Sequence, residues 1–123
     1  MAVPVHCDDE PIVLADAAAL LRGTGDGVTE YLQAAVRDAD SVLDGAKKIL
    51  DFGRPVALSL IALFPFVPDE DGARELLRRL PSELLSGSYP VAGHATADFT
   101  PEEPKAPTEQ LKASGLTWHC APR

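Results

Sequence analysis

The chain has 123 residues, 46% hydrophobic and 24% charged, which is the composition of an ordinary soluble globular domain. Its formal net charge of −8 argues against a sequence-independent nucleic-acid binder, because phosphate contacts need clustered Lys and Arg side chains. The most apolar stretch, residues 56–67, contains Pro65 and falls well short of the ~20 residues that a helix needs to cross a bilayer.

The N-terminal segment and the two cysteines together predict that the protein is cytoplasmic. No Lys or Arg accompanies the first apolar residues, so the segment lacks the pattern of a signal peptide. Without an export signal, Cys7 and Cys120 are expected to be reduced thiols. We therefore expect a cytoplasmic protein without a membrane span.

Residues 3–21 predict a strand followed directly by a helix. The strand covers residues 3–7, and Pro11 suits the first turn of an alanine-rich helix. Asp8 and Asp9 lie where the strand ends. In a nucleotide-binding sheet, an acid at this place binds the ribose hydroxyls, about 20 residues after a glycine-rich phosphate loop. No such loop fits ahead of this strand, so the pattern predicts the second half of a cofactor site without the first.

Two simpler interpretations apply to these N-terminal features. Asp8 and Asp9 also suit the positive end of the helix dipole, whatever else they bind. Residues 23–27, Gly-Thr-Gly-Asp-Gly, have the composition of a phosphate loop, but they follow a helix and precede a strand. That order is the reverse of the required one, which favours a helix stop and turn.

The middle of the chain predicts two further strands and a helix between them. Residues 28–32 alternate well enough for a strand, and Asp40 with Ser41 predicts the N-terminal cap of a helix that carries Ile49 and Leu50 toward the core. Residues 56–64 form a near-continuous apolar run, typical of a central parallel strand that is covered on both faces.

The C-terminal half continues the alternation. Acids at residues 69–71 precede a predicted helix whose apolar positions include Leu76, Leu77 and Leu80, and residues 88–92 predict a strand. Beyond it we expect an exposed linker rich in Pro and Glu over residues 99–107, then a short helix over 108–114 and either a strand or a fraying tail over 116–120. This order predicts a single α/β domain over residues 1–123, built on a mostly parallel sheet.

Four blocks of the sequence occur in the order and spacing of one known family. They are V-H-C-D-D-E-P-I-V-L-A-D, L-Q-A-A-V-R-D-A-D, R-P-V-A-L-S-L-I-A-L-F-P-F and G-S-Y-P-V-A-G-H. From residue 3 to about residue 120 the chain resembles the actinobacterial S-adenosyl methyltransferase family, formerly a domain of unknown function. The resemblance implies a Rossmann-like class I methyltransferase sheet, incomplete here because its first strand, its glycine loop and its last strands are missing.

The resemblance also implies a site for S-adenosyl-L-methionine. Asp8 would hold the ribose hydroxyls, with Asp9 beside it, and the segment containing Ala35, Val36 and Arg37 would approach the adenine. Ala35 stands where the family has an Asp, which removes an acceptor for the adenine amino group.

The resemblance also implies which residues lie near the substrate. Phe64 would line the cofactor and substrate side after the central strand, and His94 would flank the substrate mouth as a weak candidate for a catalytic base. No metal site is expected, because His6 and Cys7 are adjacent on a strand and point to opposite faces.

The function implied is methyl transfer to an unidentified small-molecule acceptor, with doubtful activity because of the missing segments. The alternative is a non-catalytic α/β relic or interaction module. A sheet without its first strand exposes an edge, which favours a homodimer or pairing with a complementing chain.

Overall fold

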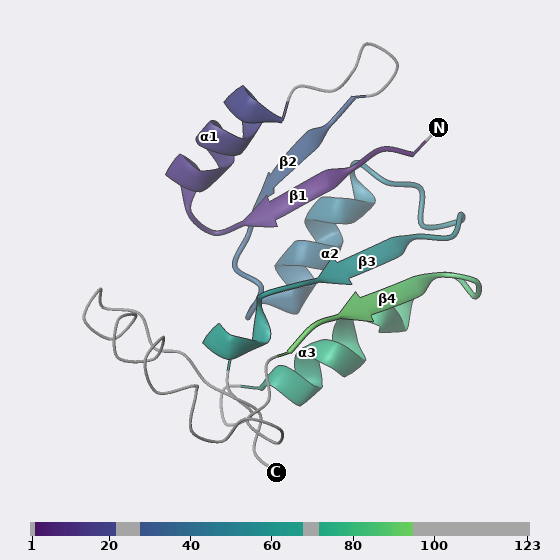
Figure 1. Cartoon of the computed structure of the whole chain (residues 1–123). Coiled ribbons are helices and arrows are strands. Elements are labelled where there is room, and N and C mark those ends of the chain that lie inside the picture. Colours follow the sequence, from purple (N-terminus) through teal and green to yellow (C-terminus); the bar gives the residue numbers. More distant parts are fainter. Residues whose placement is uncertain (1, 22–27, 68–71, 95–123) are drawn as a thin grey trace.

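The computed structural model describes residues 2–21, 28–67 and 72–94. Its elements, in chain order, are β1 (Val5–Asp8), α1 (Pro11–Leu20), β2 (Glu30–Gln33), α2 (Ala39–Lys47), β3 (Ala57–Leu60), the 3-10 helix η1 (Phe64–Phe66), α3 (Ala73–Arg79), the 3-10 helix η3 (Leu80–Glu83) and β4 (Tyr89–Ala92) (Figure 1). The linker expected over residues 99–107, the helix over 108–114, the strand or tail over 116–120 and the turn over 23–27 lie outside the described residues.

The strands form two parallel pairs. β1 pairs with β2 in a register that sets Val5 opposite Glu30, and β3 pairs with β4 in a register that sets Ala57 opposite Tyr89. In Figure 1 the strands lie in the order β2, β1, β3, β4 and point the same way, while α2 and α3 pass behind them. The predicted α/β fold with parallel strands is confirmed.

The cap of α2 differs from its prediction by two residues. Asp38 is the N-cap, and its carboxylate accepts hydrogen bonds from the Ser41 N–H at 3.1 Å and from Ser41 Oγ at 2.6 Å. These bonds lower the pKa of Asp38 below its ordinary value, because they stabilise the charged carboxylate. The expected cap at Asp40 and Ser41 was therefore wrong: Asp40 lies within the first turn, and Ser41 donates to the cap.

The central strand is shorter than its apolar run predicted. The run over residues 56–64 extends as a strand only to Leu60, because Ala62 has a φ of +57° and leaves the extended conformation. Phe64 then begins a 3-10 turn that Pro65 favours through its fixed φ. β3 is also covered on one face only, since Ala57 and Ser59 are exposed among the described residues.

The core lies between β3 and the elements α2, η1 and α3. Its buried residues are Leu43, Leu60, Phe64, Val67, Ala73, Leu76 and Leu80. Leu77, one of the apolar positions of the predicted helix, lies outside this core and is 42% exposed. Helix α2 also approaches β2 closely, because a Cβ at Gly45 would collide with the Leu32 side chain. One helix therefore packs against both strand pairs.

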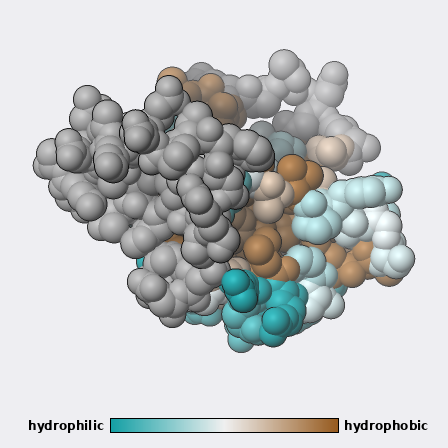
Figure 2. Space-filling model, turned by 60° about the horizontal axis from the view of Figure 1, so that its bottom comes forward, coloured by the Kyte–Doolittle hydropathy of each residue, from teal (hydrophilic) through white to brown (hydrophobic). Residues whose placement is uncertain are grey.

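Much apolar surface remains uncovered by the described residues. Helix α1 has no buried residue, and Ile12 and Leu20 are 72% and 81% exposed. Figure 2, which brings the lower side of Figure 1 forward, shows hydrophobic side chains at the surface between strongly hydrophilic ones. No helix in the described ranges is both long and apolar enough to span a membrane.

Candidate cofactor-binding site

The predicted site residues all follow the carboxyl ends of strands. Asp8 ends β1, residues 35–37 follow β2, Phe64 follows β3 and His94 follows β4. Because the strands are parallel, these ends share one edge of the molecule (Figure 1). From β1 the chain moves outward to β2. It then crosses back to β3, on the other side of β1, and moves outward in the opposite direction to β4. Ligands of open α/β sheets bind at such a reversal, outside the carboxyl ends of the strands.

Asp8 is held by its own turn. Its Oδ1 accepts a hydrogen bond from the Glu10 N–H at 2.9 Å, which orients the carboxylate just before α1 begins. Within the described residues no donor reaches Oδ2. The carboxylate therefore has a fixed direction and spare acceptor capacity.

The turns after β1 and β2 are tied to each other. Gln33 Nε2 donates to the Asp9 carbonyl oxygen at 3.3 Å, and Cys7 Sγ donates to the Ala34 carbonyl oxygen at 3.5 Å. Sequence reasoning did not single out Gln33, although it stands within the quoted L-Q-A-A-V-R block. The two contacts fix Asp8 and Asp9 relative to the loop that follows β2.

The Cys7 thiol donates a hydrogen bond to the backbone of the loop that follows β2. Desolvation by surrounding protein atoms raises its pKa above the ordinary value, and the nearby charges of Asp8 and Asp9 raise it further. A thiol with a raised pKa stays protonated at neutral pH and keeps its hydrogen for the Ala34 carbonyl oxygen.

The three residues predicted to approach the adenine have different surroundings. Ala35 is exposed, whereas Val36 is partly buried against the hydrophobic core. Arg37 is exposed and its Nη2 donates to the Phe66 carbonyl oxygen at 3.1 Å, which joins the loop after β2 to η1. Ala35 is therefore the apolar residue of this segment that is exposed at the edge.

The fold brings the rings of Phe64 and His94 together, although the two residues are 30 positions apart in the sequence. Their ring centroids are 6.0 Å apart in an edge-to-face arrangement. Phe64 is only 4% exposed and belongs to the core, while His94 is exposed. The phenyl ring thus supports the imidazole at the end of β4 rather than lying open at the surface.

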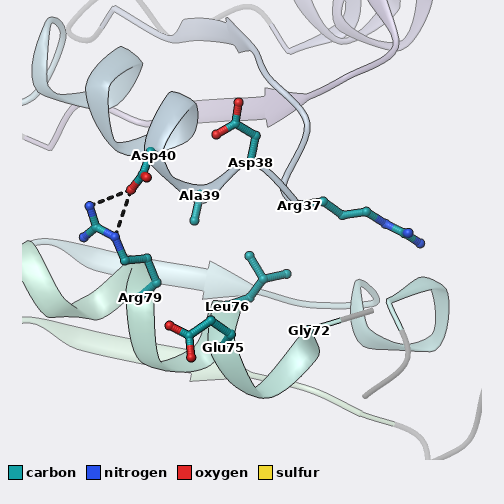
Figure 3. Close-up of a pocket in the computed structure, with 8 residues that line it drawn as sticks. All are labelled: Arg37, Asp38, Ala39, Asp40, Gly72, Glu75, Leu76 and Arg79. Atoms are coloured by element: carbon teal, nitrogen blue, oxygen red, sulfur yellow. Dashed lines mark hydrogen bonds and ion pairs between the residues drawn. The ribbon is translucent and has the colours of Figure 1, made fainter. Parts of the chain in front are cut away.

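A cleft of about 350 Å³ opens between the first turn of α2 and one side of α3, next to this edge (Figure 3). Its lining residues are Arg37, Asp38, Ala39, Asp40, Gly72, Glu75, Leu76 and Arg79. Asp40 Oδ1 accepts from Arg79 Nε at 2.9 Å at one end of the cleft. Sequence reasoning assigned only Arg37 among these residues to a binding site, because the cleft forms where the fold brings α2 and α3 together.

An ion-pair network ties α2 to α3 and η3. Arg79 Nη2 lies 2.6 Å from both Asp40 Oδ1 and Glu83 Oε1, and Lys47 Nζ pairs with Glu83 Oε2. Hydrogen bonds from Lys47 and Arg79 hold the pKa of Glu83 below its ordinary value of 4.5. The network therefore couples the packing of the two helices to the ionisation of Glu83.

We expect this coupling to appear as acid sensitivity. A carboxyl group with a lowered pKa stabilises the folded state above its unfolded-state pKa, and that contribution is lost as the pH falls through the folded-state value. The free energy of unfolding should therefore fall below about pH 4.5, and less so in Glu83→Gln. Urea unfolding at a series of acidic pH values measures this. Glu75→Gln, which removes only the exposed pair with Arg78, is the control; equal slopes for both variants would contradict the prediction.

Comparison with known proteins identifies the family of this chain. The profile of the S-adenosyl methyltransferase family matches residues 2–122, nearly the whole chain. The chain belongs to the S-adenosyl methyltransferase family. The resemblance carried by the four sequence blocks is thereby confirmed.

A solved structure supports the same family fold. The crystal structure of a DUF574 family protein from Streptomyces avermitilis MA-4680 is similar to 97% of this chain, with 38% sequence identity and a TM-score of 0.83. This chain spans 46% of the length of that structure's chain. No curated protein matches the present chain.

In this methyltransferase-family chain, the fold brings the predicted site residues to one edge but in separate groups. Asp8 and Asp9 lie with Gln33, Arg37 contacts η1, and Phe64 contacts His94. Within the described ranges, no three His, Cys, Asp or Glu side chains are grouped so as to hold a metal ion. The roles assigned to the individual residues remain predictions.

Proposed function

We propose that this chain binds S-adenosyl-L-methionine at the carboxyl edge of β1 and β2 and serves methyl transfer to a small-molecule acceptor. The observation that carries the proposal is the carboxylate of Asp8. Asp8 is the last residue of β1, next to the place where the chain crosses back from β2 to β3. The Glu10 N–H donates to its carboxylate and orients it. Family membership supplies the cofactor class, and Asp8 supplies the group that would recognise it.

The chemistry of Asp8 fits the ribose of this cofactor. Two neighbouring ribose hydroxyls are donors, and a carboxylate accepts from both with charge assistance. One oxygen of Asp8 already accepts from Glu10, but an ionised carboxylate has about four acceptor positions, so capacity remains for two hydroxyls. Asp9, whose carbonyl oxygen is held by Gln33, is exposed beside it and adds negative charge.

The loop after β2 would receive the adenine. The exposed methyl of Ala35 offers an apolar contact for the face of the ring, and Val36 anchors the loop in the core. Arg37 holds the loop against η1 through the Phe66 carbonyl oxygen. Recognition here would depend on shape and apolar contact rather than on a side-chain acceptor.

When bound, S-adenosyl-L-methionine supplies a methyl group activated by its sulfonium. The part played by this chain is to hold and orient the reactants, which is a large component of catalysis between bound partners. His94 is exposed at the end of β4, with its ring braced by Phe64, and is the candidate to take a proton from the acceptor.

Calorimetric titration with S-adenosylhomocysteine tests the proposal. We expect micromolar binding to the purified chain and a loss of roughly tenfold or more in Asp8→Ala, the range for a charge-assisted hydrogen bond. Asp8→Asn keeps an acceptor for the Glu10 N–H, so it separates loss of charge from loss of the turn. Asp16→Ala removes an exposed acid from α1 and is the matched control.

The outcomes separate the two parts of the proposal. Wild-type affinity in Asp8→Ala would show that Asp8 does not bind the ribose. No heat at millimolar ligand, from a chain whose circular dichroism shows it folded, would remove the cofactor site altogether.

A further inference from the structure

The backbone is strained at the point where the chain leaves β3. Ala62 has a φ of +57°, and among the described residues it is the one residue besides glycines with a positive φ. Ala62 is exposed, so its own burial does not account for this left-handed conformation. Backbone outliers of this kind cost free energy and gather at functional sites, where the surrounding structure holds them. This one lies at the carboxyl edge that carries the predicted site residues.

The register of β3 and β4 shows what an extended backbone would do here. Leu60 is opposite Ala92 in the parallel pair. Continued in the same register, Ala62 would be opposite His94, and Phe64 would lie about 7 Å further along the strand direction, at 3.3 Å per residue. The phenyl ring would then lie beyond the imidazole rather than next to it.

In the structure the phenyl ring lies next to the imidazole. The ring centroids of Phe64 and His94 are 6.0 Å apart, and the ring planes are inclined by 66°. Ala62 ends the extended path, and the 3-10 helix η1 follows at once (Figure 1). Within it the Val67 N–H donates to the Phe64 carbonyl oxygen at 3.2 Å, which fixes the backbone that carries the ring. The edge-to-face contact therefore requires the turn at Ala62.

Contacts on both sides of the turn hold it in place. Before it, Ile61 lies over the end of β4, because a Cβ at Gly93 would be 3.5 Å from Ile61 Cδ1. After it, Phe64 is 4% exposed in the core. Arg37 Nη2 donates to the Phe66 carbonyl oxygen at 3.1 Å and ties η1 to the loop after β2. These contacts compensate for the strain of the left-handed residue between them.

We propose that Ala62 is a positioning residue for the candidate base His94. Its left-handed backbone brings the Phe64 ring beside the imidazole, and the ring fixes the direction in which the imidazole faces the carboxyl edge. A base must lie within hydrogen-bond reach of the proton that it takes, whereas an exposed histidine without such a contact exchanges between rotamers. The role of His94 as a base rests on the proposed function; the placement of its imidazole by Ala62 does not.

NMR spectroscopy of the purified chain tests the inference. The ring current of Phe64 displaces the C–H resonances of the His94 imidazole, and His94→Gln identifies these resonances among those of the three histidines. Phe64→Leu removes the ring and gives the position of the resonances without displacement.

Substitutions of Ala62 should act according to their tolerance of the left-handed conformation. Ala62→Gly and Ala62→Asn should keep the displacement, because glycine and asparagine adopt this conformation readily. Ala62→Val should lose most of it, because a β-branched residue is strongly disfavoured there. Circular dichroism of each variant establishes that it is folded.

Ala57→Val is the matched control. It makes the same replacement at an exposed position within β3, where valine is favoured, so it should leave the displacement unchanged. Displacement kept in a folded Ala62→Val would overturn the inference. So would its loss in Ala62→Gly or Ala62→Asn, and these two variants decide the matter where Ala62→Val does not fold.

The two proposals fail separately. The NMR measurement uses no cofactor, and the titration with S-adenosylhomocysteine does not involve His94. Absence of cofactor binding together with the expected NMR result would overturn the role of His94 as a base in methyl transfer and leave its placement by Ala62 established.

Discussion

Replacement of Phe64 with Ala is expected to lower the free energy of unfolding by about 3–5 kcal/mol. The ring is 4% exposed and lies in the core with Leu60 and Leu76, so its removal takes away buried apolar surface and leaves a cavity. Domains of this kind have about 5–15 kcal/mol of stability in total, so the variant should be close to unfolding. Urea unfolding followed by circular dichroism measures the change.

Phe64→Leu is the matched variant for this prediction. Leucine keeps most of the buried volume, so the loss should stay below about 1.5 kcal/mol. The edge contact with His94 would be lost in both variants, which separates that contact from the volume of the ring. Equal losses in Phe64→Ala and Phe64→Leu would contradict a packing role and would direct attention to the ring contact instead.

Local patterns were sufficient to predict the order of the elements. The short apolar run before Asp8, the proline that opens α1 and the alternation near β2 are each contained within a few residues. The end of β3 was not predictable in this way, because residues 56–64 are apolar throughout. A single left-handed residue, Ala62, ends the strand, and nothing in an apolar run marks an alanine for that conformation.

The site was predictable only in part, for a related reason. Asp8 follows a strand directly, so its place at the carboxyl edge follows from the fold class. The contact of Gln33 with Asp9 and that of Arg37 with Phe66 join segments 24 and 29 residues apart. Such contacts depend on how strands and helices pack, which the spacing of residues along the chain does not contain.

The same limit applies to the exposure of Leu77. Leu76, Leu77 and Leu80 all fit an apolar helix stripe, and the order of residues does not say which side of α3 faces the core. In the structure Leu76 and Leu80 are 5% and 2% exposed, while Leu77 is 42% exposed. The helix turns the first two toward β3 and leaves the third outside.

This difference makes Leu80→Ala a sharp test of the packing. Leu80 lies at the junction of α3 and η3 and is almost fully buried, so its truncation should lower the free energy of unfolding by about 2–5 kcal/mol. Leu77→Ala removes the same atoms from the same helix at an exposed position. It should cost less than about 1 kcal/mol, because less apolar area leaves the interior.

The ratio between the two variants is more informative than either value. Urea unfolding at neutral pH keeps the ion pairs of Glu83 constant, so the comparison reports packing alone. A loss in Leu77→Ala as large as in Leu80→Ala would mean that the outer side of α3 is buried in solution. In that case a further stretch of polypeptide, or a second copy of the chain, would have to cover the helix on the side away from β3.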